Sequence, residues 1–257
     1  MENDQPRSAY QIDRLRQQTL VTAIAQRDAR EAAKLLMREM PNEAGRALLE
    51  LNPGQTTAIF DYLSEEYAAR LLATVPAENA RQWTRNRAYP EGSIGRMMDP
   101  VIAQFPPEIT VGEAIERLRN MIKTAFVTYG YVTNDAGKLL GIITMRDLLF
   151  TEHSRKLRDA MAADPFRLDP EIRLSEAMKR VLNRHFPVYP VCDAQGRLVG
   201  MVRGSTLFEE QNFEISAQSA SMVGVEEERL TTPWARSLRL RHPWLQLNLL
   251  TAFLAAA

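Results

Sequence analysis

The sequence predicts an α + α/β protein, in which an all-helical short-repeat superhelix precedes two tandem β-α-β-β-α units and a long C-terminal linking helix. Two observations lead to this prediction. Between positions 10 and 88, apolar pairs recur at the interval of short helices, with helix-start signals between them. Further along the chain, a glycine-containing motif and the helix pattern before it each occur twice.

The first region, residues 10–88, is typical of consecutive short helices. Its apolar pairs are Leu35-Leu36, Leu48-Leu49, Ile59-Phe60 and Leu71-Leu72. Helix-start residues fall between the pairs, at Pro41, Pro53, Ser64 and Pro76. A helix of about ten residues cannot bury its apolar stripe alone. The helices should therefore stack into a small superhelix.

Two copies of one α/β unit follow, at residues 96–152 and 158–212. The segment 137–147 is matched by the segment 196–206, and the segment 107–114 is matched by the segment 170–177. The interval between the two matched parts is longer in the first copy, which therefore has four extra residues there. The residue pattern of each copy indicates an amphipathic helix, then a β-rich run, a hairpin arm and a final helix.

The repeat also gives local predictions. Asp99-Pro100 aligns with Asp164-Pro165, near the start of each unit. Pro187 and Pro190 interrupt the β-rich run of the second copy, and proline cannot donate to a ladder, so this strand should be an edge or irregular strand. In the same run, Cys192 is expected to be a buried, unreactive thiol, which fits a cytosolic protein.

Composition and motif searches exclude several classes of function. Lysine plus arginine and aspartate plus glutamate both total 32, so no net charge points to nucleic acid. The chain has no nucleophile elbow, P-loop, zinc-protease or dinucleotide motif, and we therefore expect no enzyme. The three histidines and the single cysteine show no transition-metal spacing.

The C-terminal part predicts contact with a membrane. Residues 213–242 are typical of a linking helix that ends in a basic cluster, and residues 243–257 are apolar. The apolar stretch is shorter than the roughly 20 residues of a membrane span. Arginines precede it and a tryptophan lies at its start, as where a chain enters the membrane from the cytoplasm. We interpret it as the truncated start of a transmembrane helix; the alternative is a helix docked on the core.

Motifs of the two units carry a family resemblance. Gly141-Ile-Ile-Thr-Met-Arg-Asp147 and Gly200-Met-Val-Arg-Gly-Ser-Thr206 resemble CBS domains, which are paired nucleotide-sensing modules. With the helical region, the Tyr-Pro-Glu motif at 89–91 and the Pro-Trp-Leu motif at 243–245, the order of parts resembles the cytosolic region of an MgtE-type magnesium transporter.

This resemblance implies a regulatory region at the cytoplasmic face of the cell membrane. It implies a homodimer through the CBS domains, and a plug helix against the transmembrane pore domain. It also implies that Mg²⁺ bound among acidic residues holds the N and CBS domains compact and gates the pore. A hard cation can bring carboxylates together that otherwise repel one another.

An adenine-nucleotide site, for ATP or a related nucleotide, is predicted in the first unit. Asp147 would accept from ribose hydroxyls, Thr144 and Arg146 would lie near the phosphates, and Tyr129 and Phe186 would stack on the adenine. The Thr-x-x-Asp pattern is also a helix capping box, and aromatic residues in β-runs are often core residues. In the second unit the corresponding positions hold Arg203 and Thr206, so sensing should be one-sided.

The candidate Mg²⁺ ligands are scattered carboxylates, namely Glu91, Asp99, Glu171 and Glu209. Four positions that are acidic in related transporters hold Gly92, His185, Ser205 and Thr206 here. One alternative is a soluble CBS-pair adenine-nucleotide sensor that acts on a protein partner. Another is a CBS pair that only assembles the dimer.

Overall fold

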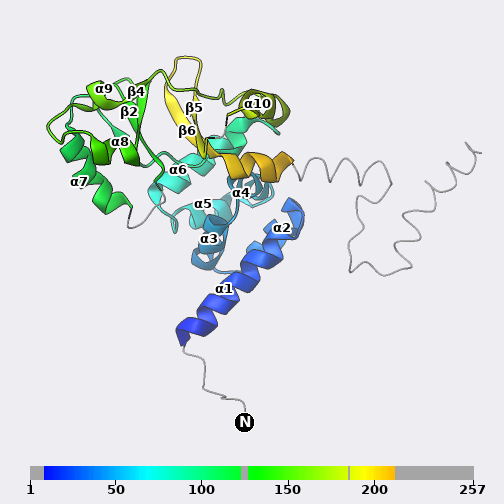
Figure 1. Ribbon diagram of the computed structural model, residues 1–257. Helices are drawn as coiled ribbons and strands as arrows, with labels where there is room; N and C mark the ends of the chain where they lie inside the picture. The colour runs from blue at the N-terminus through cyan, green and yellow to red at the C-terminus, as the bar shows by residue number, and fades with distance from the viewer. Residues whose placement is uncertain (1–8, 123–126, 185, 212–257) are drawn as a thin grey trace, which may run out of the picture. The chain divides into compact units, whose positions relative to one another are not determined.

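A computed structural model describes residues 9–122, 127–184 and 186–211 (Figure 1). The described residues up to Leu207 belong to one compact unit. The linking helix and the transmembrane start predicted for residues 213–257 lie outside the described residues. In the part of the chain that is described, no helix is both long and apolar enough to cross a membrane.

The N-terminal region is helical, as predicted. Its helices are α1 (Ala9–Ala25), α2 (Ala29–Leu36), α3 (Pro41–Glu50), α4 (Pro53–Phe60), α5 (Glu65–Leu72) and α6 (Ala77–Asn86). The predicted start signals are confirmed: Pro41 and Pro53 open α3 and α4, the Ser64 side chain accepts from the Tyr67 N–H, and Pro76 precedes α6.

The apolar pairs supply the core of this helical region. Leu36, Leu48, Phe60 and Leu71 are almost fully buried. Leu49, by contrast, is 39% exposed, so its pair contributes only one core residue. Figure 1 shows the short helices following one another, so each apolar stripe is covered by neighbouring helices.

The first α/β unit contains one four-stranded sheet. Its elements are the 3₁₀ helix η1 (Ile94–Met97), β1 (Gln104–Phe105), α7 (Val111–Met121), β2 (Tyr129–Thr133), β3 (Leu139–Thr144), α8 (Met145–Phe150), α9 (Leu157–Ala160) and β4 (Ala162–Ala163). The strand order is β1-β2-β3-β4, with β1 parallel to β2 and the other pairs antiparallel.

The second unit repeats this plan with α10 (Leu174–Val181), β5 (Val188–Cys192) and β6 (Leu198–Arg203), followed by helical residues 204–211. Its two strands form an antiparallel pair. Helix α10 corresponds to α7, and β5 and β6 correspond to β2 and β3. Helix α7 has 11 residues and α10 has 8, and the interval before the next strand is one residue longer in the first unit, so the four extra residues of the first copy lie partly in α7 and partly after it.

Each unit is completed by the opening segment of the other unit. In the first, Ala162 pairs with Ile142 of β3; in the second, Asp99 pairs with Met201 of β6. Because Ile142 and Met201 occupy the same position in the repeated motif, Asp99 corresponds to Ala162. The predicted alignment of Asp99-Pro100 with Asp164-Pro165 is therefore wrong, because a shared Asp-Pro dipeptide does not fix strand register.

The structure bears on two predictions about β5. Within the described residues the strand pairs with β6 on one side and through an isolated bridge with Leu168 on the other, so it is not an edge strand. It is irregular, as the alternative predicted, because its register with β6 shifts between Val191 and Cys192. Pro190 has no N–H to donate, but its carbonyl accepts from the Leu168 N–H at 2.9 Å. Cys192 is buried, and burial raises the pKa of its thiol to about 11, so the thiol is protonated and inert at neutral pH.

The turns of the two units are hydrogen-bonded to each other. The Leu139 N–H donates to the Gly196 carbonyl, and the Leu198 N–H donates to the Gly137 carbonyl, both at 3.0 Å. Behind the turns, one apolar cluster contains Tyr131 together with residues of the second unit such as Cys192. The two units therefore share backbone bonds and core.

The helical region is joined to the first unit through buried polar groups. The Asn86 side chain is fully buried, and its Nδ2 donates to the Met98 carbonyl at 2.8 Å. Thr57 Oγ1 donates to the Arg96 carbonyl at the same distance. Because these donors are sheltered from water, losing their acceptors would be costly.

Candidate functional site

The predicted Thr144 and Asp147 side chains meet at the start of α8. Thr144 donates to Asp147 Oδ2 from its N–H at 3.0 Å and from its hydroxyl at 2.7 Å, and the Asp147 N–H returns a bond to Thr144 Oγ1 at 3.1 Å. The capping-box interpretation of this pair is confirmed. Among the described residues, Asp147 Oδ1 accepts no hydrogen bond. A ribose hydroxyl would thus find an acceptor whose orientation is already fixed.

Tyr129 lies beside this pair. It is the direct strand partner of Thr144 in the β2–β3 ladder, so the two side chains project from the same face of the sheet. Tyr129 is half-buried, and burial raises the pKa of its phenol, with the nearby Tyr189 contributing. Arg146 is exposed in the first turn of α8. These four residues of the first unit therefore gather around one helix start.

A small cavity lies next to Tyr129. It is lined by Ile102, Ala103, Val127, Thr128, Tyr129, Tyr131 and Met201. Its volume of about 10 Å³ holds about one water molecule. Within the described residues, the buried Thr128 Oγ1 has no hydrogen-bond partner. An adenine ring would enter here only if the surrounding side chains moved apart.

Phe186 lies in the second unit. Its ring is 5.9 Å from that of Tyr189, and a side chain at Gly204 would lie 3.1 Å from the Phe186 carbonyl oxygen. No contact links Phe186 to Thr144 or Asp147 in the described part of the chain. Its stacking role therefore stays a prediction, although its exposed fraction of 46% leaves ring surface for a ligand.

In the second unit, an internal ion pair occupies the corresponding place. Arg203 Nε lies 2.8 Å from Asp99 Oδ2, and Arg203 Nη2 lies 3.4 Å from Asp99 Oδ1. The Asp99 side chain is only 19% exposed, and burial raises the pKa of its carboxyl in spite of Arg203. Thr206, at the position of Asp147, is buried.

Sequence reasoning missed this pair. It assigned Asp99 to a metal site, and it considered Arg203 only as the residue that replaces the Thr144 hydroxyl in the second unit. The repeat contained a signal for this pair. Gly141 of β3 is equivalent to Gly200 of β6, so the pairing of β4 with β3 implies a corresponding pairing of Asp99 with β6. The acid is already bound to a guanidinium, so a metal ion would have to displace Arg203.

The other candidate Mg²⁺ ligands, Glu91, Glu171 and Glu209, are exposed. The segments that carry the first two are paired, since the Leu174 N–H donates to the Gly92 carbonyl at 3.0 Å. In the described residues, no three His, Cys, Asp or Glu side chains form a group that could hold a metal ion. The Mg²⁺ site stays a prediction.

Comparison with known proteins agrees with this geometry. The CBS domain family model matches residues 93–153 and 157–211. The magnesium transporter MgtE of Bacillus subtilis (strain 168) is 25% identical over 194 residues, which cover 72% of this chain and 42% of the transporter. The chain is homologous to the cytosolic region of MgtE magnesium transporters.

Two further matches extend the comparison with MgtE. The MgtE of Thermus thermophilus is 25% identical over 173 residues, 66% of this chain and 38% of that protein. The crystal structure of the cytosolic domain of the Mg²⁺ channel MgtE in complex with ATP has a TM-score of 0.64 and 22% identity, and covers 77% of this chain and 85% of that one. The predicted fold of a helical region plus a tandem CBS pair is confirmed. The chain spans less than half the length of these two transporters.

Proposed function

We propose that this chain is the regulatory, non-catalytic cytosolic region of a magnesium transporter, at the cytoplasmic face of the membrane. The observation that supports this most is the extent of the match to two MgtE transporters, which covers 72% and 66% of the chain and so exceeds the CBS pair. The proposed division is an N domain at 10–88, CBS units at 96–152 and 158–212, a plug helix at 213–242 and the start of a transmembrane helix at 243–257.

Mg²⁺ would regulate the pore by compacting the N and CBS domains. Exposed carboxylates such as Glu91, Glu171 and Glu209 repel one another, and a divalent cation between them favours the compact state. The ligands would come together only in that state, or between two copies of the chain. The transmembrane pore domain is the partner that the change would act on.

Limited proteolysis with and without millimolar Mg²⁺ tests this mechanism. We expect Mg²⁺ to protect the linker 85–95, which joins the helical region to the first CBS unit. Ca²⁺ at the same concentration serves as a comparison, because it prefers larger and more flexible coordination. Equal cleavage with and without Mg²⁺ would contradict Mg²⁺-dependent compaction.

The first CBS unit would bind an adenine nucleotide. Three observations support this site. The Asp147 carboxylate is held in one orientation by Thr144, Tyr129 lies beside it, and within the described residues the Thr128 hydroxyl at the small cavity has no hydrogen-bond partner. In the second unit the Asp99–Arg203 pair occupies the corresponding place, so we expect each chain to bind one nucleotide.

Calorimetry with ATP, ADP and AMP tests the nucleotide site. Asp147→Asn keeps an oxygen that can cap α8 but removes the charge, so we expect a fall in affinity of about tenfold, as when one charged hydrogen bond is lost. Asp135→Asn, in the exposed turn between β2 and β3, is the matched control and should bind like the wild type. Nucleotide binding that survives in Asp147→Asn unchanged would refute the assignment.

A soluble nucleotide sensor acting on a protein partner is the second candidate, favoured by the same capping-box geometry. The two functions differ in their ligand response. A sensor binds nucleotide and shows no Mg²⁺-dependent protection of the linker 85–95, whereas a transporter gate shows that protection.

We also propose a homodimer through the CBS domains. Large apolar side chains lie exposed on three helices of the pair: Ile122 at the end of α7, Leu149 and Phe150 in α8, and Leu182 at the end of α10. Exposed fractions of 76% for Leu149 and 84% for Phe150 are unfavourable in water. A second copy that covers them would remove this cost.

A further inference from the structure

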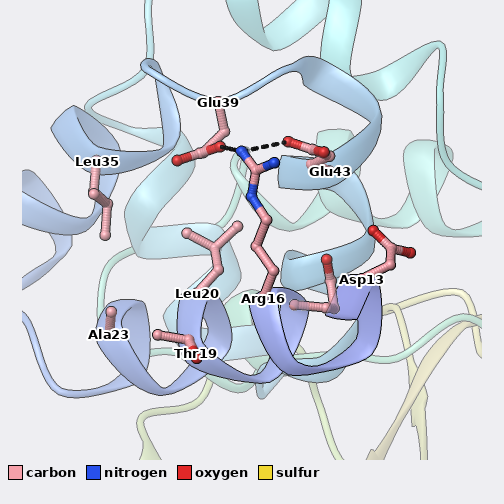
Figure 2. A pocket seen from close by; sticks show the side chains of 9 residues that line it. Asp13, Arg16, Thr19, Leu20, Ala23, Leu35, Glu39 and Glu43 are labelled. Carbon is pink, nitrogen blue, oxygen red and sulfur yellow. Dashed lines mark hydrogen bonds and ion pairs between the residues drawn. The ribbon is translucent and has the colours of Figure 1, made fainter. Parts of the chain in front are cut away.

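A groove lies between α1 and the two helices that follow it (Figure 2). Its volume of about 430 Å³ is in the range of pockets that hold ligands. Leu20 and Ala23 of α1 and Leu35 of α2 give it an apolar wall. Figure 2 shows Arg16 reaching from α1 to Glu39 and Glu43 at the opposite rim. We call this the α1 groove.

The charges in the α1 groove are incompletely matched. Arg16 Nη2 lies 3.4 Å from Glu39 Oε2 and 3.7 Å from Glu43 Oε2, both longer than a strong charged hydrogen bond. The Arg16 side chain is 68% exposed, whereas the two carboxylates are only 24% and 14% exposed. One loosely held guanidinium therefore serves two sheltered carboxylates. Both retain acceptor capacity for a second cation.

The rim that carries the two carboxylates is held in place by α5. The Tyr67 hydroxyl donates to the Leu36 carbonyl at 2.6 Å, and its oxygen lies 3.0 Å from the Glu39 carbonyl oxygen. The Thr74 hydroxyl, just after α5, shares its hydrogen between the Leu71 carbonyl at 2.7 Å and the Pro41 carbonyl at 3.1 Å. A preorganised site loses less entropy when a ligand binds.

A neutral group in the same groove also lacks a partner. Gln17 Nε2 is buried and makes no hydrogen bond within the described residues. A buried amide N–H without an acceptor is unfavourable, and a carbonyl oxygen would satisfy it. A second, more open cavity of about 450 Å³ lies beside the first on the surface of α1 and shares Thr19 and Ala23 with it. A segment that reaches the groove could therefore also lie against this side of α1.

We propose that the α1 groove binds an arginine side chain presented by an extended segment of a partner protein. The incoming guanidinium displaces Arg16 from between Glu39 and Glu43, the aliphatic stem packs on Leu20 and Leu35, and a backbone carbonyl accepts from Gln17. The chain's own Arg16 shows that a guanidinium fits between the two carboxylates. This site is separate from the CBS pair and independent of nucleotide or Mg²⁺ binding there.

A metal ion suits the groove less well. The described residues contain no group of three acidic, His or Cys side chains that could hold one. Asp13, the third carboxylate of the lining, is paired with Arg46 at 3.3 Å. The apolar wall offers no oxygen ligand, whereas it suits the hydrocarbon stem of an arginine.

The test uses the whole 257-residue chain and the peptide acetyl-Ala-Leu-Arg-Leu-Ala-amide, with titration calorimetry as the readout. Citrulline in place of the peptide's arginine keeps the shape and removes the charge. Agmatine is the free small-molecule arm. We expect the citrulline peptide and agmatine each to bind at least about tenfold more weakly than the arginine peptide, because each lacks one part of the recognition.

Variants of the chain locate the binding. Glu43→Gln should weaken the arginine peptide about tenfold, while Glu50→Gln, exposed at the end of the same helix, should have no effect. Arg16→Ala should tighten binding, because it frees both carboxylates, and a misfolded variant would not do so. Equal binding of the citrulline peptide, unchanged binding to Glu43→Gln or weaker binding to Arg16→Ala would overturn the proposal. Agmatine binding as tightly as the peptide would overturn the assignment to a protein segment.

Discussion

The Asp99–Arg203 pair shows what two substitutions do to a repeated position. The corresponding residues of the first unit are Ala162 and Thr144, and Thr144 caps α8 beside an open carboxylate. In the second unit a carboxylate and a guanidinium fill the same place. The desolvation of Asp99 outweighs the attraction of Arg203, so the pair closes the site without necessarily stabilising the fold.

This balance makes a pH prediction for Asp99. Its pKa in the folded chain is raised above the ordinary value of 3.8, so the folded state binds the proton more tightly than the unfolded state. The contribution of Asp99 to stability is therefore greatest below pH 3.8 and is lost as pH rises through the raised pKa. Denaturant unfolding measures this. The free energy of unfolding of Asp99→Asn minus that of the wild type should be larger at pH 7 than at pH 4.

Asp193 is the control with the opposite sign. Burial tends to raise its pKa, but hydrogen bonds from Arg197 and Gln195 outweigh this effect and lower it. Its contribution to stability is therefore present above pH 3.8 and is lost as pH falls through the lowered pKa. If Asp99→Asn and Asp193→Asn show the same pH trend, the explanation for Asp99 is wrong.

Helix α6, together with Thr57 of α4, ties the helical region to the CBS pair. Asn86, its last residue, accepts from Gln82 Nε2 at 2.8 Å and donates to the Met98 carbonyl. Asn86→Ala leaves both groups buried and unpaired, so we expect a loss of about 2–4 kcal/mol in the free energy of unfolding. Thr84→Ala, on the exposed side of the same helix, should change it by less than about 0.5 kcal/mol. Equal losses in chemical denaturation would rule out a special role for Asn86.

Helix α8 carries both the capping box and the most exposed apolar residues of the CBS pair. If Leu149 and Phe150 lie in a dimer interface, Phe150→Glu buries an unpaired charge there and should convert the dimer to monomer at micromolar concentration. Multi-angle light scattering measures the mass directly. Tyr62→Glu, also at an exposed aromatic but after α4, should leave the mass unchanged. A monomeric wild type would contradict the proposed dimer.

Over the whole described chain, the sequence predicted architecture better than contacts. Local signals fix helix starts such as Pro53 and Ser64, because a cap acts only within the first turn of its helix. The repeat fixed the order of parts and the first-unit pair of Thr144 and Asp147. The Asp99–Arg203 bond was not predicted, because it joins residues 104 positions apart.

The α1 groove was not predicted either, for a related reason. Arg16, Glu39 and Glu43 look like ordinary charged residues of separate helices in the sequence. Only the packing of α1 on α2 and α3 brings them together. Charge alone cannot distinguish such a site from a solvated surface, since most exposed ion pairs contribute little.

The two CBS units exchange short strand segments, so neither unit can be lost from the gene without affecting the other. Asp99, near the start of the first unit, pairs with β6 of the second, and β4, near the start of the second unit, pairs with β3 of the first. Deleting either unit would leave the other with an uncovered strand edge. Each unit therefore depends on the other for part of its strand pairing, whether or not either unit binds a ligand.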